Sequence, residues 1–178
     1  MQGLKRGTVA LLPHQDIWRE EALETIAGLK ALLGGAAIDI QHVGSTAIPT
    51  IHAKPILDIA VGVGRPEDIL PYTGPLEQAG FFFRGQDVPG QLLFVRGDLR
   101  QDTRTHHIHI VPWNGPAWQD YIGFRDYLIA HPEKAAAYEA VKQALALRFP
   151  NDRAAYTAGK QEIIGRLLAE ARLRQSGR

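Results

Sequence analysis

Residues 55–63 read PILDIAVGV, an almost unbroken apolar run that carries one acidic side chain, Asp58. A run of this kind predicts a central β-strand that is covered on both faces. A carboxylate inside such a strand is costly to desolvate unless it is hydrogen-bonded, paired with a cation or bound to a metal ion. Asp58 is therefore the leading candidate for a functional acid. The alternative is that it faces water at the end of a half-exposed strand.

The segment before this strand, HVGSTAIP at residues 42–49, is the best candidate for a phosphate-binding turn. Gly44 lets the backbone turn sharply after a strand predicted over residues 36–43. Ser45 and Thr46 then offer hydroxyl and backbone N–H groups, which are the groups that hold a phosphate. A glycine followed by a serine also forms many ordinary turns. Phosphate binding is indicated mainly because the strand with Asp58 follows.

A second polar motif, THHIHIV at residues 105–111, predicts another strand. Alternation along a strand places His107 and His109 on one face and His106 on the other. Two imidazoles so spaced can ligate a transition metal or act as an acid and a base. They can equally line a polar groove that holds no metal. We expect the remaining histidines near the candidate site to be packing or loop residues, namely His14, His42 and His52.

Three basic residues are candidates for contact with a phosphate. Lys54 stands at the entrance to strand 55–63, Arg125 on a helix predicted over residues 117–130, and Lys160 on a helix predicted over residues 152–173. For each of them, the alternative is an ordinary solvated side chain. A further basic group alternates with acids, which favours a self-neutralised loop rather than a nucleic-acid patch. That group is Arg96, Arg100 and Arg104, with Asp98 and Asp102.

The composition fits one globular domain spanning residues 1–178. Of the 178 residues, 45% are hydrophobic, and a domain of this size buries about two thirds of its unfolded surface. There is no cysteine, which excludes disulfides and cysteine-ligated zinc. The net charge of +1 gives no field for nucleic acid, and no apolar run approaches the ~20 residues of a membrane span. We expect a cytoplasmic protein whose partner is a small molecule.

The order of the predicted elements indicates an α+β fold. A helix after Asp16 ends at Gly34 and precedes the first two strands. After Pro112 the chain is helical to its end. This order predicts helices packed on a small, mixed β-sheet. The further elements are a helix at residues 66–79, strands at 91–95 and 105–111, and helices at 117–130, from 132 onward and at 152–173.

Several motifs, in order, resemble those of the GrpB family over about residues 10–172. GSTAIPTIHAKPILDI at residues 44–59 resembles the family hallmark, a Gly-Ser-Thr turn followed by an Ala-Lys-Pro segment and an aspartate. HHIHIV at residues 106–111 resembles its paired-histidine strand. FRDYLIAHPEKAAAYEAVKQALA at residues 124–146 and YTAGKQEII at residues 156–164 resemble its helical signatures.

The resemblance implies a nucleotidyltransferase-like fold, in which a Gly-Ser turn holds a nucleotide phosphate and a strand with two carboxylates holds Mg²⁺. Gly44, Ser45 and Asp58 match that pattern, but Ala60 stands where the second carboxylate belongs. His107 or His109 stands where a third acid is expected. We therefore expect a divalent ion, Mg²⁺ or Mn²⁺ with Zn²⁺ as the alternative.

The expected site has a metal-binding part and a phosphate-binding part. Asp58, His107 and His109 are the expected metal ligands and catalytic residues. The expected phosphate- or nucleotide-binding residues are Gly44, Ser45, Thr46, Lys54, Arg125 and Lys160.

Three hypotheses on function follow. The first is a protein that binds a nucleotide or another phosphate ligand and carries out metal-dependent phosphoryl or nucleotidyl transfer. The second is a non-catalytic nucleotide-binding module of the same fold, because Ala60 leaves a two-metal site incomplete. The third is a metal-dependent phosphoesterase centred on the histidines. Family members fused to dephospho-CoA kinase suggest coenzyme A or its precursors as an associated chemistry, without giving a mechanism.

Overall fold

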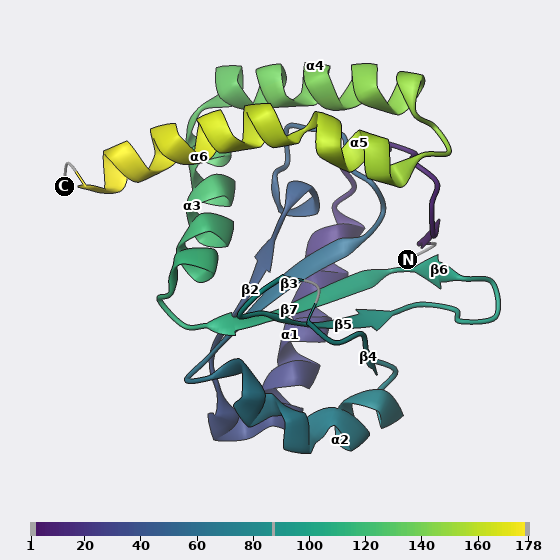
Figure 1. Cartoon of the computed structure of the whole chain (residues 1–178), viewed down its shortest axis with the longest axis vertical. Helices are drawn as coiled ribbons and strands as arrows, with labels where there is room; N and C mark the ends of the chain where they lie inside the picture. The colour runs from purple at the N-terminus through teal and green to yellow at the C-terminus, as the bar shows by residue number, and fades with distance from the viewer. Residues whose placement is uncertain (1–2, 87, 177–178) are drawn as a thin grey trace.

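Five strands form a mixed β-sheet in the order β2-β3-β7-β5-β4. The computed structural model describes residues 3–86 and 88–176. β3 and β7 run parallel, and the other neighbouring strands are antiparallel (Figure 1). A separate two-stranded ribbon pairs β1, Leu4–Lys5, with β6, Thr103–Arg104. The strands of the main sheet are β2 Ala37–Val43, β3 Leu57–Val63, β4 Phe82–Phe83, β5 Leu92–Arg96 and β7 His106–Pro112.

Helices cover both faces of the sheet. α1, Ile17–Leu33, packs on one face, and α3, Pro116–Ala130, packs on the other. Figure 1 shows α4 beside α5 and α6 at one end of the molecule, with α2 at the opposite end. The predicted α+β class is confirmed. The remaining helices are α2 Thr73–Gln78, α4 Pro132–Arg148, α5 Arg153–Gly159 and α6 Gln161–Ser176.

β3 is an interior strand covered on both faces, as its apolar sequence predicts. Leu57 and Ile59 are fully buried in the core that the sheet forms with α1. Ala60 lies on the opposite face, in a smaller cluster with Trp118 of α3. The strand is shorter than the predicted 55–63. Residues 54–56 form a turn in which the Ile56 N–H donates to the Lys54 carbonyl at 2.7 Å.

Gly62 allows the close approach of α3 to β3. A Cβ atom added at Gly62 would lie 2.7 Å from Cδ1 of Trp113 and 2.9 Å from Cζ3 of Trp118. The Gly62→Ala variant should therefore lose about 1–3 kcal/mol of unfolding free energy through overpacking, measured by urea denaturation. Gly28→Ala in α1 is the control, since nothing lies within 4 Å of its added Cβ. Equal stability of the two variants would contradict this packing.

Two predicted helices differ from the structure. Residues 66–79 are not one α-helix: Pro66–Tyr72 is a 3₁₀-helix, and α2 begins at Thr73. Pro71 has no N–H for an α-helical hydrogen bond, which explains the late start of α2. The helix predicted at residues 152–173 is divided into α5 and α6 at Lys160. Gly159, a weak helix former, packs there against Leu145 of α4.

The helical end of the chain supplies the wall that faces the sheet. α3, α4 and α6 contact one another, and their buried side chains form a cluster with Ile48 and Ile51 from the segment before β3. No helix within the described residues is both long and apolar enough to cross a membrane. Of these helices, α3 packs directly on the face of the sheet that carries Asp58, and α4 and α6 pack against α3.

Candidate functional site

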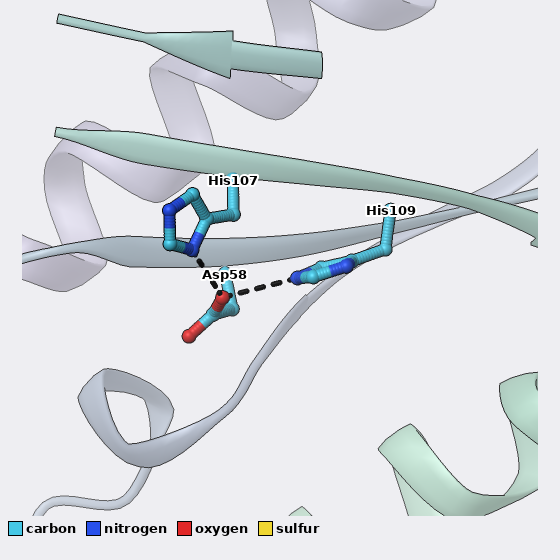
Figure 2. Close-up of side chains that lie close together, drawn as sticks. All are labelled: Asp58, His107 and His109. Carbon is cyan, nitrogen blue, oxygen red and sulfur yellow. Dashed lines mark hydrogen bonds and ion pairs between the residues drawn. The ribbon is translucent and has the colours of Figure 1, made fainter. Parts of the chain in front are cut away.

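Asp58, His107 and His109 meet on one face of the sheet (Figure 2). Asp58 lies in β3, and the parallel register places His107 of β7 directly beside it. Oδ1 of Asp58 is 3.3 Å from Nδ1 of His107 and 3.1 Å from Nε2 of His109. His106 lies on the opposite face, buried near Thr25 of α1, with 3.1 Å between its Nε2 and the threonine hydroxyl. Strand alternation thus divides the histidines as their spacing predicts.

The Asp58 carboxylate is ionised and reachable. Burial raises the pKa of this carboxyl, but hydrogen bonds from His107 and His109 outweigh burial and hold the pKa well below its usual range. The Asp58 side chain is still 31% exposed, against 12% for His107 and 17% for His109. A cation or a ligand can therefore approach the carboxylate from the solvent side.

The hydrogen bonds behind His109 set its orientation. The Tyr121 hydroxyl donates to Oε1 of Gln91 at 3.1 Å and lies 3.2 Å from Nδ1 of His109. With its proton on Gln91, the tyrosine oxygen accepts a hydrogen bond from Nδ1–H of His109. Nε2 of the same ring then faces Oδ1 of Asp58 at 3.1 Å, where a proton or a bound cation can bridge the two atoms.

Gly44 is fitted to the space beside Asp58. Its φ is 72°, a conformation that side-chain-bearing residues rarely adopt. A Cβ at this position would also lie 2.7 Å from Oδ2 of Asp58. Ser45–Ala47 then form a short 3₁₀-helix. The hydroxyl of Thr46 is buried and 2.9 Å from Nε2 of His42, whereas the Ser45 side chain is hydrogen-bonded to Tyr138 in the cavity lining.

A cavity of about 430 Å³ contains the predicted site residues except Arg125. The sheet and the Gly44 turn form one wall, and α3, α4, α5 and α6 contribute the facing side chains. The predicted residues in its lining are Gly44, Ser45, Thr46, Lys54, Asp58, His107, His109 and Lys160.

Arg125 lies elsewhere. One of its terminal nitrogens donates to the His42 carbonyl at 2.8 Å and to Oε1 of Gln41 at 3.0 Å, and its Nε donates to Asp126 at 2.7 Å. It lines a different cavity, together with His14 and other residues. Arg125 therefore joins α3 to the edge strand β2, and the hydrogen bonds of its guanidinium are made to residues outside the cavity of Asp58.

Two cavity cations were not predicted from the sequence, Lys142 of α4 and Arg153 of α5. Lys142 is 1% exposed and donates to the carbonyl of His52, while the His52 ring pairs with Glu139 of α4. These contacts attach the segment before β3 to α4. No motif marks either cation, because a lysine or arginine in an amphipathic helix ordinarily faces solvent.

The cavity lysines lose part of their basicity. Burial, reinforced by neighbouring cations, lowers the pKa of Lys142 to about 7 and that of Lys54 to about 8. Burial also lowers the pKa of Lys160 to about 8, although Asp58 opposes the shift. Burial lowers the pKa of His42 to about 4, so this histidine is neutral at physiological pH. The lysines are therefore sensitive to any anion that enters the cavity.

Known proteins resemble this chain in sequence. A family model described as GrpB protein matches residues 8–170. The chain is 36% identical over 173 residues to the glutamate-rich protein GrpB of Alkalihalophilus pseudofirmus, covering 96% of this chain and 99% of the relative. It is 28% identical over 184 residues to a dephospho-CoA kinase of Mycolicibacterium paratuberculosis, covering 89% of this chain and 44% of the kinase.

Solved structures resemble it in fold. The crystal structure of conserved protein GrpB from Enterococcus faecalis matches with a TM-score of 0.81 at 28% identity, covering 90% of this chain and 98% of that one. A structure of the Cid1 poly(U) polymerase matches with a TM-score of 0.53 at 14% identity, covering 76% of this chain and 43% of the polymerase. The fold is therefore nucleotidyltransferase-like.

Proposed function

The chain belongs to the GrpB family, and we propose that it binds a nucleotide or another phosphate-bearing ligand together with a divalent metal ion. One observation carries the proposal. The ligand atoms of Asp58, His107 and His109 lie within 4.8 Å of one another, in the cavity that the Gly44–Ser45 turn also lines. The reaction class that this arrangement supports is metal-dependent phosphoryl or nucleotidyl transfer.

The donor set fits a transition-metal ion. Two imidazoles and one carboxylate suit Zn²⁺ or Mn²⁺ better than Mg²⁺, which prefers oxygen ligands alone. Three protein ligands leave a coordination position for a phosphate oxygen or a water. A bound divalent ion would supply Lewis-acid polarisation of a phosphoryl oxygen. The contact of His109 with Tyr121 supports this assignment, because it directs Nε2 toward the Asp58 carboxylate, where one cation could bind both groups.

The residues around the metal ligands have separate roles. The Ser45 hydroxyl and backbone N–H groups of the turn, which line the cavity, would donate to a phosphate oxygen. Lys54 and Lys160 would neutralise phosphate charge. The Cid1 structure contains Mg and 3′-dATP, which makes nucleoside triphosphates the first ligands to test here.

A non-catalytic binding module is the second candidate, and Ala60 favours it. Ala60 is fully buried against Val43, Val111 and Trp118. The position is therefore filled by the core, and a second carboxylate has no place there. A two-metal reaction is disfavoured, whereas ligand binding and single-metal chemistry, including phosphoester hydrolysis, remain compatible with the site.

A thermal-shift screen distinguishes these candidates. The purified protein is heated with nucleoside triphosphates or coenzyme A precursors, each with Mg²⁺, Mn²⁺ or Zn²⁺. A ligand at a hundred times its Kd should add about 2.7 kcal/mol of stability. A shift that requires nucleotide and metal together supports the proposal, and a shift with nucleotide alone supports the binding module. A shift with metal alone, accompanied by hydrolysis of a phosphate ester, supports the phosphoesterase, and no shift contradicts all three.

Removing the hydroxyl behind His109 should weaken metal binding. In Tyr121→Phe, Nδ1 of His109 loses its partner, so the ring can turn or take the other tautomer. We expect a rise of about tenfold or more in the Kd for Zn²⁺, measured by competition with a chromogenic chelator. Tyr127→Phe is the control, because its hydroxyl bonds to Glu170, outside the cavity lining. An unchanged Kd in Tyr121→Phe would exclude His109 as a ligand oriented by Tyr121.

A further inference from the structure

The cavity holds more positive charge than its single acid can balance. Lys54, Lys142, Arg153 and Lys160 line it, and among the described lining residues Asp58 is the one acid. None of these four cations forms an ion pair with a carboxylate of the described residues. We call these four residues the cation cluster. Burial of charges without counter-charges is costly, which indicates that the balancing anion comes from a ligand.

Aromatic rings and the backbone hold the cluster in place. Nζ of Lys160 lies 4.5 Å and Nζ of Lys54 lies 5.4 Å from the centre of the Tyr156 ring. Nζ of Lys142 lies 4.8 Å from the centre of the Tyr138 ring and donates to the His52 carbonyl. Such contacts position ammonium groups without neutralising them. The cluster is thus a built feature of the cavity and is drawn from three different segments.

We infer that the cation cluster is a subsite for a second anionic group, so that the natural ligand carries a diphosphate or triphosphate chain rather than one phosphate. The inference rests on the proposed function and sharpens its substrate class. One phosphate at the Gly44–Ser45 turn and the metal ligands would leave the cluster unbalanced. A longer phosphate chain in the same cavity of about 430 Å³ balances both.

The basicity of the cluster agrees with this assignment. Burial and the neighbouring cations lower the pKa of its lysines. A polyphosphate among them favours the charged form and raises those pKa values again. Binding near pH 8 should therefore take up protons from the buffer.

Another cavity, lined in part by α1, lacks this imbalance. It has a volume of about 700 Å³, and its lining includes Arg96 together with Glu21, Glu24 and Asp98. Acids outnumber the arginine there, so a polyphosphate would be repelled rather than bound.

Binding of inorganic anions without metal tests the inference. The full chain is titrated calorimetrically in EDTA at pH 7.5 with phosphate, pyrophosphate and tripolyphosphate. We expect the Kd to fall about tenfold or more from phosphate to tripolyphosphate, because each added charged contact contributes about that factor. Lys160→Met and Lys54→Met should each weaken tripolyphosphate binding about tenfold. Lys30→Met, an exposed change in α1 outside this cavity, should leave it unchanged.

The outcomes separate this inference from the proposed metal site. Equal affinity for the three anions, or cluster variants that behave like Lys30→Met while remaining folded by circular dichroism, would overturn the subsite. Asp58→Asn should bind tripolyphosphate in EDTA at least as tightly as the parent, because the cluster is intact and one negative charge is gone. If tripolyphosphate binds but no metal does, the proposed metal site fails and the subsite stands.

Discussion

The Asp58→Ala variant should lose metal binding and, with it, any stabilisation that requires nucleotide and metal together. Asp58 supplies the one negative ligand of the site, and its Oδ1 is approached by both imidazoles. Two neutral imidazoles alone hold a divalent ion weakly. Since loss of a supporting residue behind a ligand costs about 10–100-fold in affinity, loss of the charged ligand itself should cost more than ~100-fold.

Two measurements, with one matched control, test this expectation. The Kd for Zn²⁺ and Mn²⁺ is measured by chelator competition, and the thermal shift is repeated with nucleotide and metal. Asp39→Ala in β2 is the control, because Asp39 bonds to the Ile40 N–H and the Gln41 side chain and does not line the cavity. Unchanged metal affinity in Asp58→Ala would remove the centre of the proposed site.

The stability of the ligand-free Asp58→Ala protein is part of the same test. The carboxylate accepts two hydrogen bonds but remains partly exposed, so water can replace it beside the histidines. We expect the variant to fold, with the loss of only a few degrees in Tm. If instead it fails to fold while Asp39→Ala folds normally, Asp58 is a structural residue that holds β3 to β7.

The three residues of the proposed metal site could be singled out from the sequence because they follow local periodicity. An apolar run around Asp58 predicts a covered strand, and alternate positions in a strand share a face, which groups His107 with His109. What periodicity could not supply was the strand order. The parallel pairing of β3 with β7, in register at Asp58 and His107, is a long-range feature of the fold.

The cations of the cavity were harder to predict. Arg125 and Lys142 are both basic residues in helices. Arg125 donates a hydrogen bond to the His42 carbonyl of the edge strand β2, whereas Lys142 is buried and donates to the His52 carbonyl. Which side of a helix faces a cavity depends on how helices cross, and sequence patterns do not encode this for a single charged residue. The break at Gly159 adds to the difficulty, because it places Lys160 at a junction between two helices.

The ligand-free protein should become more stable as the pH rises from 7 to 9, with Lys142 as a principal cause. The pKa of Lys142 is about 7 in the folded protein, against 10.5 for an ordinary lysine. Between those values the unfolded chain binds a proton that the folded chain does not bind, so the unfolding free energy increases with pH. For this lysine alone the increase between pH 7 and pH 9 is about 2 kcal/mol. Lys54 and Lys160, whose pKa values are also lowered, act in the same direction.

Urea unfolding at pH 7, 8 and 9 measures this effect, and Lys142→Met should reduce its slope. The slope is the diagnostic quantity, because the variant also leaves the His52 carbonyl without its donor, which changes absolute stability. The charged groups that act on Lys142 are Lys54, Lys160 and Glu139. Lys30→Met should keep the parent slope. Saturating tripolyphosphate should flatten the slope in the parent, because an anion that holds the lysines in their charged form removes the difference in bound protons. A slope unaffected by both Lys142→Met and tripolyphosphate would mean that the cluster does not couple protons to anion binding.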